Sequence, residues 1–103
     1  MKERQYQTKL IKKIKEMFPD CYVVRNDPAF SQGIPDILIL FNDKWAMLEI
    51  KLDDNSPRQP NQEYYIEYFA EMSFASFINP NNEEEVLNAL QQAFGLERET
   101  CVS

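Results

Sequence analysis

The chain has 103 residues, enough for one domain with its own core and too few for two domains of ordinary size. Hydrophobic residues make up 44% of it and glycine occurs only twice, a composition that excludes collagen-like and wholly disordered proteins. The absence of histidine excludes imidazole-based catalytic triads and the usual zinc hydrolase sites. The net charge of -6 argues against nucleic-acid binding through a uniformly basic surface. We therefore expect one domain over residues 1–103, with chemistry that depends on carboxylates, lysines and a bound cation.

The sequence gives no sign of export or of membrane insertion. No apolar run approaches the length needed to cross a bilayer, and the first residues lack the hydrophobic segment of a signal peptide. We therefore expect a cytoplasmic protein that has no membrane partner.

The first half of the chain predicts a helix followed by three strands. Residues 3–18 have apolar side chains at spacings of three, four and seven, which indicates an amphipathic helix. Residues 21–25 are typical of a short strand, and residues 26–33 of a polar loop. Two β-type runs, 34–41 and 45–51, flank Asn42-Asp43-Lys44, so we expect a hairpin.

The second half predicts two helices and one further strand. Residues 53–60 contain two prolines among polar turn formers and indicate a loop. Residues 61–72 resume helical spacing, residues 74–78 indicate a strand, and Asn82 is the predicted N-cap of a helix that ends at Gly95. The predicted order is α-β-β-β-α-β-α. Because both faces of the hairpin are apolar, we expect an α/β fold with helices on both faces of a mixed sheet.

Three charged residues lie within this apolar hairpin, where burial is costly. Asp36 begins one strand, and Glu49 and Lys51 lie near the end of the next, two residues apart and so on the same face. A two-residue Asn42-Asp43 turn, or a four-residue turn of the same register, places Asp36 opposite Glu49, whereas a three-residue turn makes it face away. We expect the facing arrangement, because two converging carboxylates form a site for a hard divalent cation.

This pattern resembles the catalytic signature of PD-(D/E)XK nucleases. The matching residues are Gly33-Ile34-Pro35-Asp36, an apolar strand, and then Glu49-Ile50-Lys51. More closely, the chain resembles the VRR-NUC branch, which includes Holliday-junction-resolvase-like proteins of phages and bacteria. In that branch a glutamine begins the helix after the Glu-x-Lys strand and an aromatic residue follows three positions later, as Gln62 and Tyr65 do here.

The same branch has an acidic residue on the first helix with a glutamine four positions later, which Glu3 and Gln7 match. The likeness covers roughly residues 3–78. It implies a restriction-endonuclease-like core and an origin in a phage or a bacterium.

The resemblance implies a Mg²⁺- or Mn²⁺-dependent endonuclease that hydrolyses DNA, expected to be branched, as a two-fold homodimer. The implied catalytic residues are Asp36, Glu49, Lys51 and Gln62. The implied metal ligands are Asp36, Glu49, the Ile50 carbonyl and Glu3. The implied DNA-binding residues are Lys9, Lys12, Lys13, Arg25 and Arg58.

Other interpretations stay open at this point. Lys51 also fits a structural ion pair with a carboxylate, Gln62 a helix-capping residue, and Glu3 a first-turn acid favoured by the helix dipole. The lysines of the first helix also fit a solvated face. For the whole chain, the competing hypotheses are a non-catalytic binding module on the same fold and a nuclease of single strands or RNA.

Overall fold

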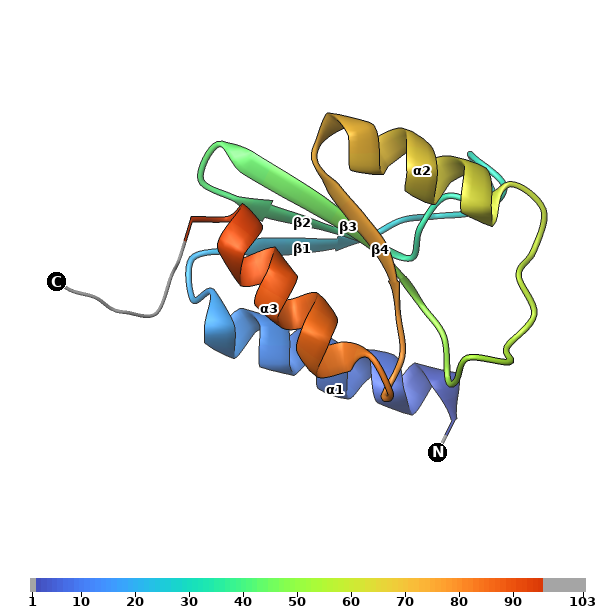
Figure 1. Cartoon of the computed structure of the whole chain (residues 1–103), viewed down its shortest axis with the longest axis horizontal. Coiled ribbons are helices and arrows are strands. Elements are labelled where there is room, and N and C mark those ends of the chain that lie inside the picture. Colours follow the sequence, from blue (N-terminus) through green and yellow to red (C-terminus); the bar gives the residue numbers. More distant parts are fainter. Residues whose placement is uncertain (1, 96–103) are drawn as a thin grey trace, which may run out of the picture.

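The computed structural model describes residues 2–95, so residue 1 and residues 96–103 of the predicted domain lie outside the described part. Seven elements follow in the predicted order (Figure 1). They are α1 (Glu3–Met17), β1 (Tyr22–Arg25), β2 (Ile37–Phe41), β3 (Lys44–Ile50), α2 (Gln62–Met72), β4 (Phe74–Ile78) and α3 (Glu83–Ala93). None of these helices is both long and apolar enough to cross a membrane.

The four strands form one mixed sheet in the order β1-β2-β3-β4. The β1–β2 and β2–β3 pairs are antiparallel, and β4 lies parallel to β3. Helix α2 provides the crossover between these parallel strands, as parallel pairing requires. The predicted α/β class with a mixed sheet is therefore confirmed.

The β2–β3 hairpin has the two-residue turn that places Asp36 and Glu49 in opposite positions. Phe41 pairs with Lys44, and Asn42 at the turn has a left-handed φ of 56°. Strand β2 begins at Ile37 rather than at residue 34, so the predicted start is wrong. Pro35 cannot donate a ladder hydrogen bond, and its carbonyl accepts one from the Asn26 side chain instead, 2.9 Å away.

Helices α1 and α3 cover one face of the sheet, where the main core lies (Figure 1). Alternate residues of β2 and β3 point into this core and are fully buried. At one end of the core the rings of Phe18, Phe41 and Phe94 pack with centroids 5.2–5.5 Å apart. Because α1 and α3 occupy this face of the sheet, α2 packs on the opposite face.

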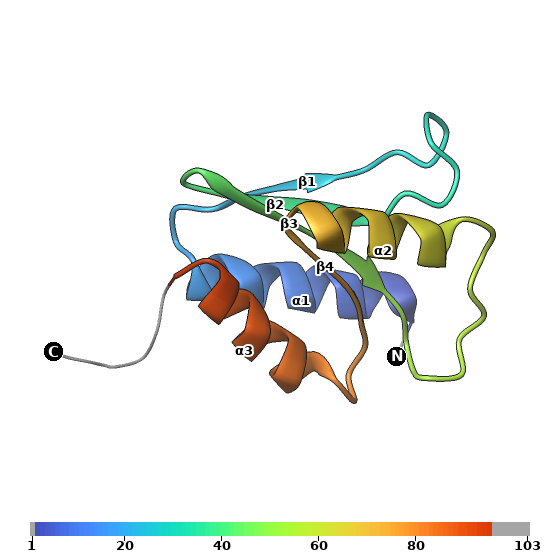
Figure 2. The same ribbon diagram turned by 45° about the horizontal axis from the view of Figure 1, so that its top comes forward.

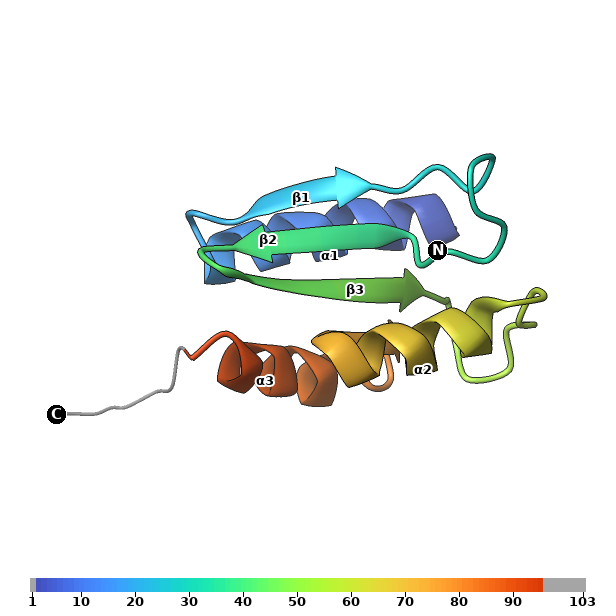
Figure 3. The ribbon, with the colours of Figure 1, turned by 90° about the horizontal axis from the view of Figure 1, so that it is seen from above.

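Helix α2 covers only part of that opposite face. Trp45 packs edge-to-face against Phe69 of α2, with ring centroids 5.9 Å apart. Tyr22 and Leu40, on the β1–β2 half, are 68% and 40% exposed. Figure 3 shows α2 beside β3, with β1 and β2 uncovered. Helices therefore lie on both faces, as predicted, but one helix about 10 Å wide covers only roughly two strands spaced about 4.8 Å apart, which leaves the β1–β2 half of this face uncovered.

Candidate active site

Asp36 lies at the end of the sheet where α2 begins, immediately before β2. Its Oδ2 accepts a hydrogen bond of 2.9 Å from the backbone N–H of Ile50, which holds the carboxylate beside the end of β3. Burial raises the pKa of Asp36, although the hydrogen bond from the Ile50 N–H and the charges of Lys51 and Arg25 oppose this increase.

Glu49 is the most deeply buried charged residue of this region, at 3% exposure. Its Oε2 accepts a hydrogen bond of 3.0 Å from the Gln62 side-chain amide, whereas its buried Oε1 has no hydrogen-bond partner among the described residues. Burial, and next the charge of Asp36, raise the pKa of Glu49 to about 8. A buried carboxylate oxygen without a donor is costly, so this oxygen requires either a proton or a cation.

Lys51 follows β3 directly, and its ammonium group lies 3.7 Å from Glu49 Oε2. The same Nζ donates hydrogen bonds of 2.9 Å to the side-chain carbonyl of Gln62 and to the backbone carbonyl of Pro57. These two hydrogen bonds and the ion pair with Glu49 fix the position of the charge. Lys51 is therefore part of an ion pair and also points its charge at the carboxylate cluster, so its two interpretations are compatible.

Gln62 connects the two charged residues. It is 9% exposed, and besides contacting Glu49 and Lys51 its Oε1 accepts a hydrogen bond of 2.8 Å from the N–H of Gln59. The Gln62 side chain therefore joins the turn before α2 to the carboxylate cluster, and none of these hydrogen bonds caps an N–H of α2. Sequence reasoning missed the part played by the Pro57 carbonyl and the Gln59 N–H, because backbone groups leave no signal in residue identity.

The donors of this cluster fit a hard divalent cation. Asp36 and Glu49 offer two converging carboxylates, and the unpartnered Oε1 of Glu49 is an available ligand oxygen. Within residues 2–95 no group of three or more His, Cys, Asp or Glu side chains is placed to hold a metal ion. Such a cation would complete its coordination with backbone carbonyls, among which Ile50 stays a prediction, and with water, which Mg²⁺ keeps readily.

Glu3 approaches this cluster from the other side of the sheet. It is exposed at the first position of α1, which packs on the face opposite to the one that carries Glu49. Its charge nevertheless contributes to the raised pKa of Glu49. Glu3 therefore influences the site around the end of the sheet, and its role as a metal ligand stays a prediction.

The predicted DNA-binding residues divide into two groups. The Arg25 guanidinium donates a hydrogen bond to Gln7, and its charge lowers the pKa of Asp36. Arg58 pairs with Glu63 at 2.6 Å, stacks 3.9 Å above the ring centre of Phe77, and lines a polar hollow with Lys51. These two arginines lie beside the site.

The three predicted lysines lie further along α1. Lys9 and Lys12 are exposed, whereas the Lys13 ammonium group pairs with Glu83 of α3 at 2.8 Å. This pair partly neutralises the charge of Lys13. All five roles in DNA binding stay predictions.

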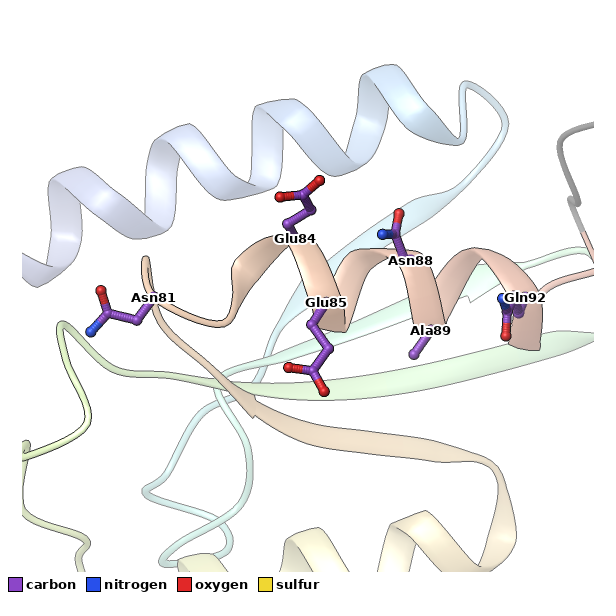
Figure 4. Close-up of a pocket in the computed structure, with 6 residues that line it drawn as sticks. All are labelled: Asn81, Glu84, Glu85, Asn88, Ala89 and Gln92. Carbon is purple, nitrogen blue, oxygen red and sulfur yellow. The ribbon is translucent and has the colours of Figure 1, made fainter.

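A second hollow lies on α3, away from the carboxylate cluster. Its lining residues are Asn81, Glu84, Glu85, Asn88, Ala89 and Gln92. Figure 4 shows the side chains of Glu84 and Glu85 pointing to opposite sides of the helix. These two carboxylates do not converge on one ligand, so we place the candidate chemistry at Asp36 and Glu49.

Comparison with known proteins identifies a shared fold. A solved structure named "VRR_NUC domain protein" matches this chain with a TM-score of 0.64 and 24% sequence identity, over 93% of this chain and 90% of that one. No family model and no curated protein matches the sequence. The chain is therefore similar in fold to a VRR_NUC domain protein along nearly its whole length.

Proposed function

We propose that this protein is a metal-dependent endonuclease that hydrolyses phosphodiester bonds of DNA. The observation that carries the proposal is the buried Oε1 of Glu49, which has no partner among the described residues and lies beside a second carboxylate and a fixed lysine. The fold shared with a VRR_NUC domain protein supports the same activity. The Asp36, Glu49-Ile50-Lys51 and Gln62 pattern of the sequence supports it independently.

In the proposed mechanism Asp36, Glu49 and the Ile50 carbonyl would hold Mg²⁺ or Mn²⁺. When bound there, the ion would supply Lewis acidity and positive charge for hydrolysis of the phosphodiester. Lys51 stabilises the negative charge that develops on the phosphate oxygens, because its ammonium group is already positioned by Gln62 and Pro57. Gln62 thus fixes the distance between the lysine and the carboxylates.

Basic side chains at this end of the sheet offer contacts for a polyanionic substrate. Arg25 and Arg58 lie next to the carboxylate cluster and can contact backbone phosphates on either side of the scissile bond, with Lys9 and Lys12 as more distant contacts. The overall charge of -6 limits non-specific adhesion to duplex DNA. We propose branched DNA, such as a four-way junction, as the preferred substrate.

The proposal is tested by cleavage of labelled four-way junction, flap, single-strand and duplex DNA in Mg²⁺, Mn²⁺ or EDTA. Wild type is expected to cut only with a cation, and Asp36→Ala and Lys51→Ala are expected to abolish cutting. Asp43→Ala and Lys44→Ala are matched controls, because this exposed pair occupies the turn at the opposite end of the same hairpin. The controls should retain full activity.

The competing hypothesis is a non-catalytic DNA-binding module on the same fold. It predicts that well-folded wild type cuts none of these substrates, has no affinity for Mg²⁺ or Mn²⁺, and binds DNA equally well after Asp36→Ala. Cutting that survives Asp36→Ala would contradict the proposed active site. Cation-dependent cutting of RNA alone would replace the DNA substrate and keep the site.

We also propose that the protein works as a two-fold homodimer, since two equal sites can cut opposed strands of a symmetric junction. Helix α2 exposes Tyr64, Tyr68 and Met72 at intervals of four residues, a partly apolar stripe that a second copy would cover. Sedimentation velocity should show a dimer that Tyr68→Glu dissociates. A wild-type monomer at all concentrations would contradict the homodimer and leave the active site unaffected.

A further inference from the structure

Phe30 is an aromatic residue displayed on the surface, in the part of the chain that leads to Asp36. It is 88% exposed, although aromatic side chains of this size usually contribute their apolar area to a core. It lies in the segment that joins β1 to β2 and that ends at Asp36. Figures 2 and 3 show this segment extending past the end of the sheet where α2 begins.

The segment that carries Phe30 has defined local structure. The side chain of Asp27 accepts a hydrogen bond from the N–H of Ala29, and the Asp27 carbonyl accepts one from the N–H of Phe30. Further along, the Asn61 side chain donates to the carbonyl of Gln32. The first two bonds define the turn, and the third joins the segment to the start of α2. Ordering this segment when a ligand binds to the Phe30 ring therefore costs little conformational entropy.

Phe30 is close along the chain to Asp36, a residue of the proposed active site. It precedes Asp36 by six residues, so the two lie within about 20 Å along even a fully extended chain. Its immediate neighbours Ala29 and Ser31 are uncharged, which suits the flat face of a base better than a phosphate. A base in a continuous duplex has both faces stacked, so only an unpaired or terminal base offers a free face to this ring.

Building on the proposed nuclease function, we propose that Phe30 stacks on an unpaired DNA base close to the cleavage point and thereby makes the enzyme select DNA with a branch or a single-stranded segment. The site is a specificity determinant that acts on binding, separate from the carboxylates and Lys51. Its ligand is the face of a nucleobase, and any of the four bases can supply it.

The test compares the affinity for a flap or junction with the affinity for a fully paired duplex of the same length, measured by fluorescence anisotropy in Ca²⁺. Phe30→Ala should lower the ratio of these affinities roughly 5- to 150-fold, the range expected for loss of one base–aromatic contact. Phe30→Trp should keep the ratio near the wild-type value, and Phe30→Leu should lose it. Tyr22→Ala removes a similarly exposed ring from the opposite end of β1 and should leave the ratio unchanged.

Each outcome decides one question. An unchanged ratio in Phe30→Ala, or an equal loss in Tyr22→Ala, would overturn the stacking role, and so would full retention in Phe30→Leu. A dimer that dissociates in Phe30→Ala would assign the ring to a protein contact and would also overturn it. If wild type cuts DNA and the ratio does not change, only this inference fails, whereas failure of wild type to bind or cut any DNA rejects the proposed function itself.

Discussion

Gly33 lies directly against Asn61, the residue that precedes α2. A β carbon on Gly33 would lie 2.6 Å from the Pro60 carbonyl oxygen and 2.7 Å from the Asn61 β carbon, closer than such atoms approach one another. Asn61 itself has a left-handed φ of 73°. This contact joins the β1–β2 segment to the start of α2, so it sets the distance between Asp36 on one side and Gln62 on the other.

Gly33→Ala should therefore disturb the site as well as the fold. Gly33 has a φ of +89°, which costs an alanine about 1 kcal/mol, and the clash with Pro60 and Asn61 should add about 1–3 kcal/mol. Gly95→Ala is the matched control, because Gly95 has a similar φ of +79° and open space around it. Urea unfolding should show the larger loss for Gly33→Ala, and cleavage should fall in that variant alone. Equal losses of stability would contradict the steric explanation.

Gln62→Ala should lower stability and cleavage together. The substitution removes one donor to Glu49 and one acceptor that serves both Lys51 and the N–H of Gln59, at a cost of roughly 2–3 kcal/mol. Lys51 then loses one of the groups that fix its position, so we expect kcat to fall about 10- to 100-fold. The measurements are urea unfolding and single-turnover cleavage at saturating cation.

The control for this prediction is Gln59→Ala. This substitution keeps the backbone N–H that donates a hydrogen bond to the Gln62 side chain, and it removes only an exposed side chain. It should behave as wild type in both measurements. If Gln62→Ala loses stability yet keeps its full rate when folded, Gln62 has only a structural role.

The hairpin register was predictable from sequence because the relevant information is local. The Asn42-Asp43 pair favours a two-residue turn, and such a turn specifies which residues of the two adjacent strands face each other. That register alone brings Asp36 opposite Glu49. The pairing of the candidate carboxylates was therefore predictable without knowledge of the helices.

The parts that were not predictable depend on the path of the chain between elements. Gln62 reaches Glu49 only because the loop over residues 51–61 returns to the sheet, and no local pattern determines that return. Likewise, the periodicity of α1 shows which side of the helix is buried and does not show which face of the sheet it covers, so the position of Glu3 on the face opposite to Glu49 was not predictable. The uncovered β1–β2 half of the sheet was not predictable for the same reason, because local patterns do not show which strands a helix covers.

Glu83 should contribute to stability without affecting cleavage. Its carboxylate accepts hydrogen bonds of 2.8 Å from the Tyr6 hydroxyl and from the Lys13 ammonium group, so it joins α3 to α1. Glu83→Gln should lower the free energy of unfolding by about 1 kcal/mol, since a charged acceptor becomes neutral. Glu85→Gln, an exposed neighbour, should change it little. A loss of cleavage in folded Glu83→Gln would contradict this purely structural role.

The stability of the metal-free protein should fall as pH rises, because of Glu49. Its ordinary pKa is 4.5, and burial, and next the charge of Asp36, raise it to about 8 in the folded state. Between these two pKa values the folded chain keeps a proton on Glu49 that the unfolded chain releases. The contribution of this proton to the free energy of unfolding is therefore complete below pH 4.5 and is lost as pH rises through about 8. In EDTA, Tm should therefore decrease over this range, and the decrease should be smaller in Glu49→Gln.

Mg²⁺ displaces the proton of Glu49, so the increase in Tm that Mg²⁺ causes should grow with pH in wild type and disappear in Glu49→Gln. Glu67→Gln, an exposed change on α2, controls for the other titrating groups. If wild type and Glu49→Gln show the same dependence on pH and on Mg²⁺, Glu49 neither carries the extra proton nor holds the cation.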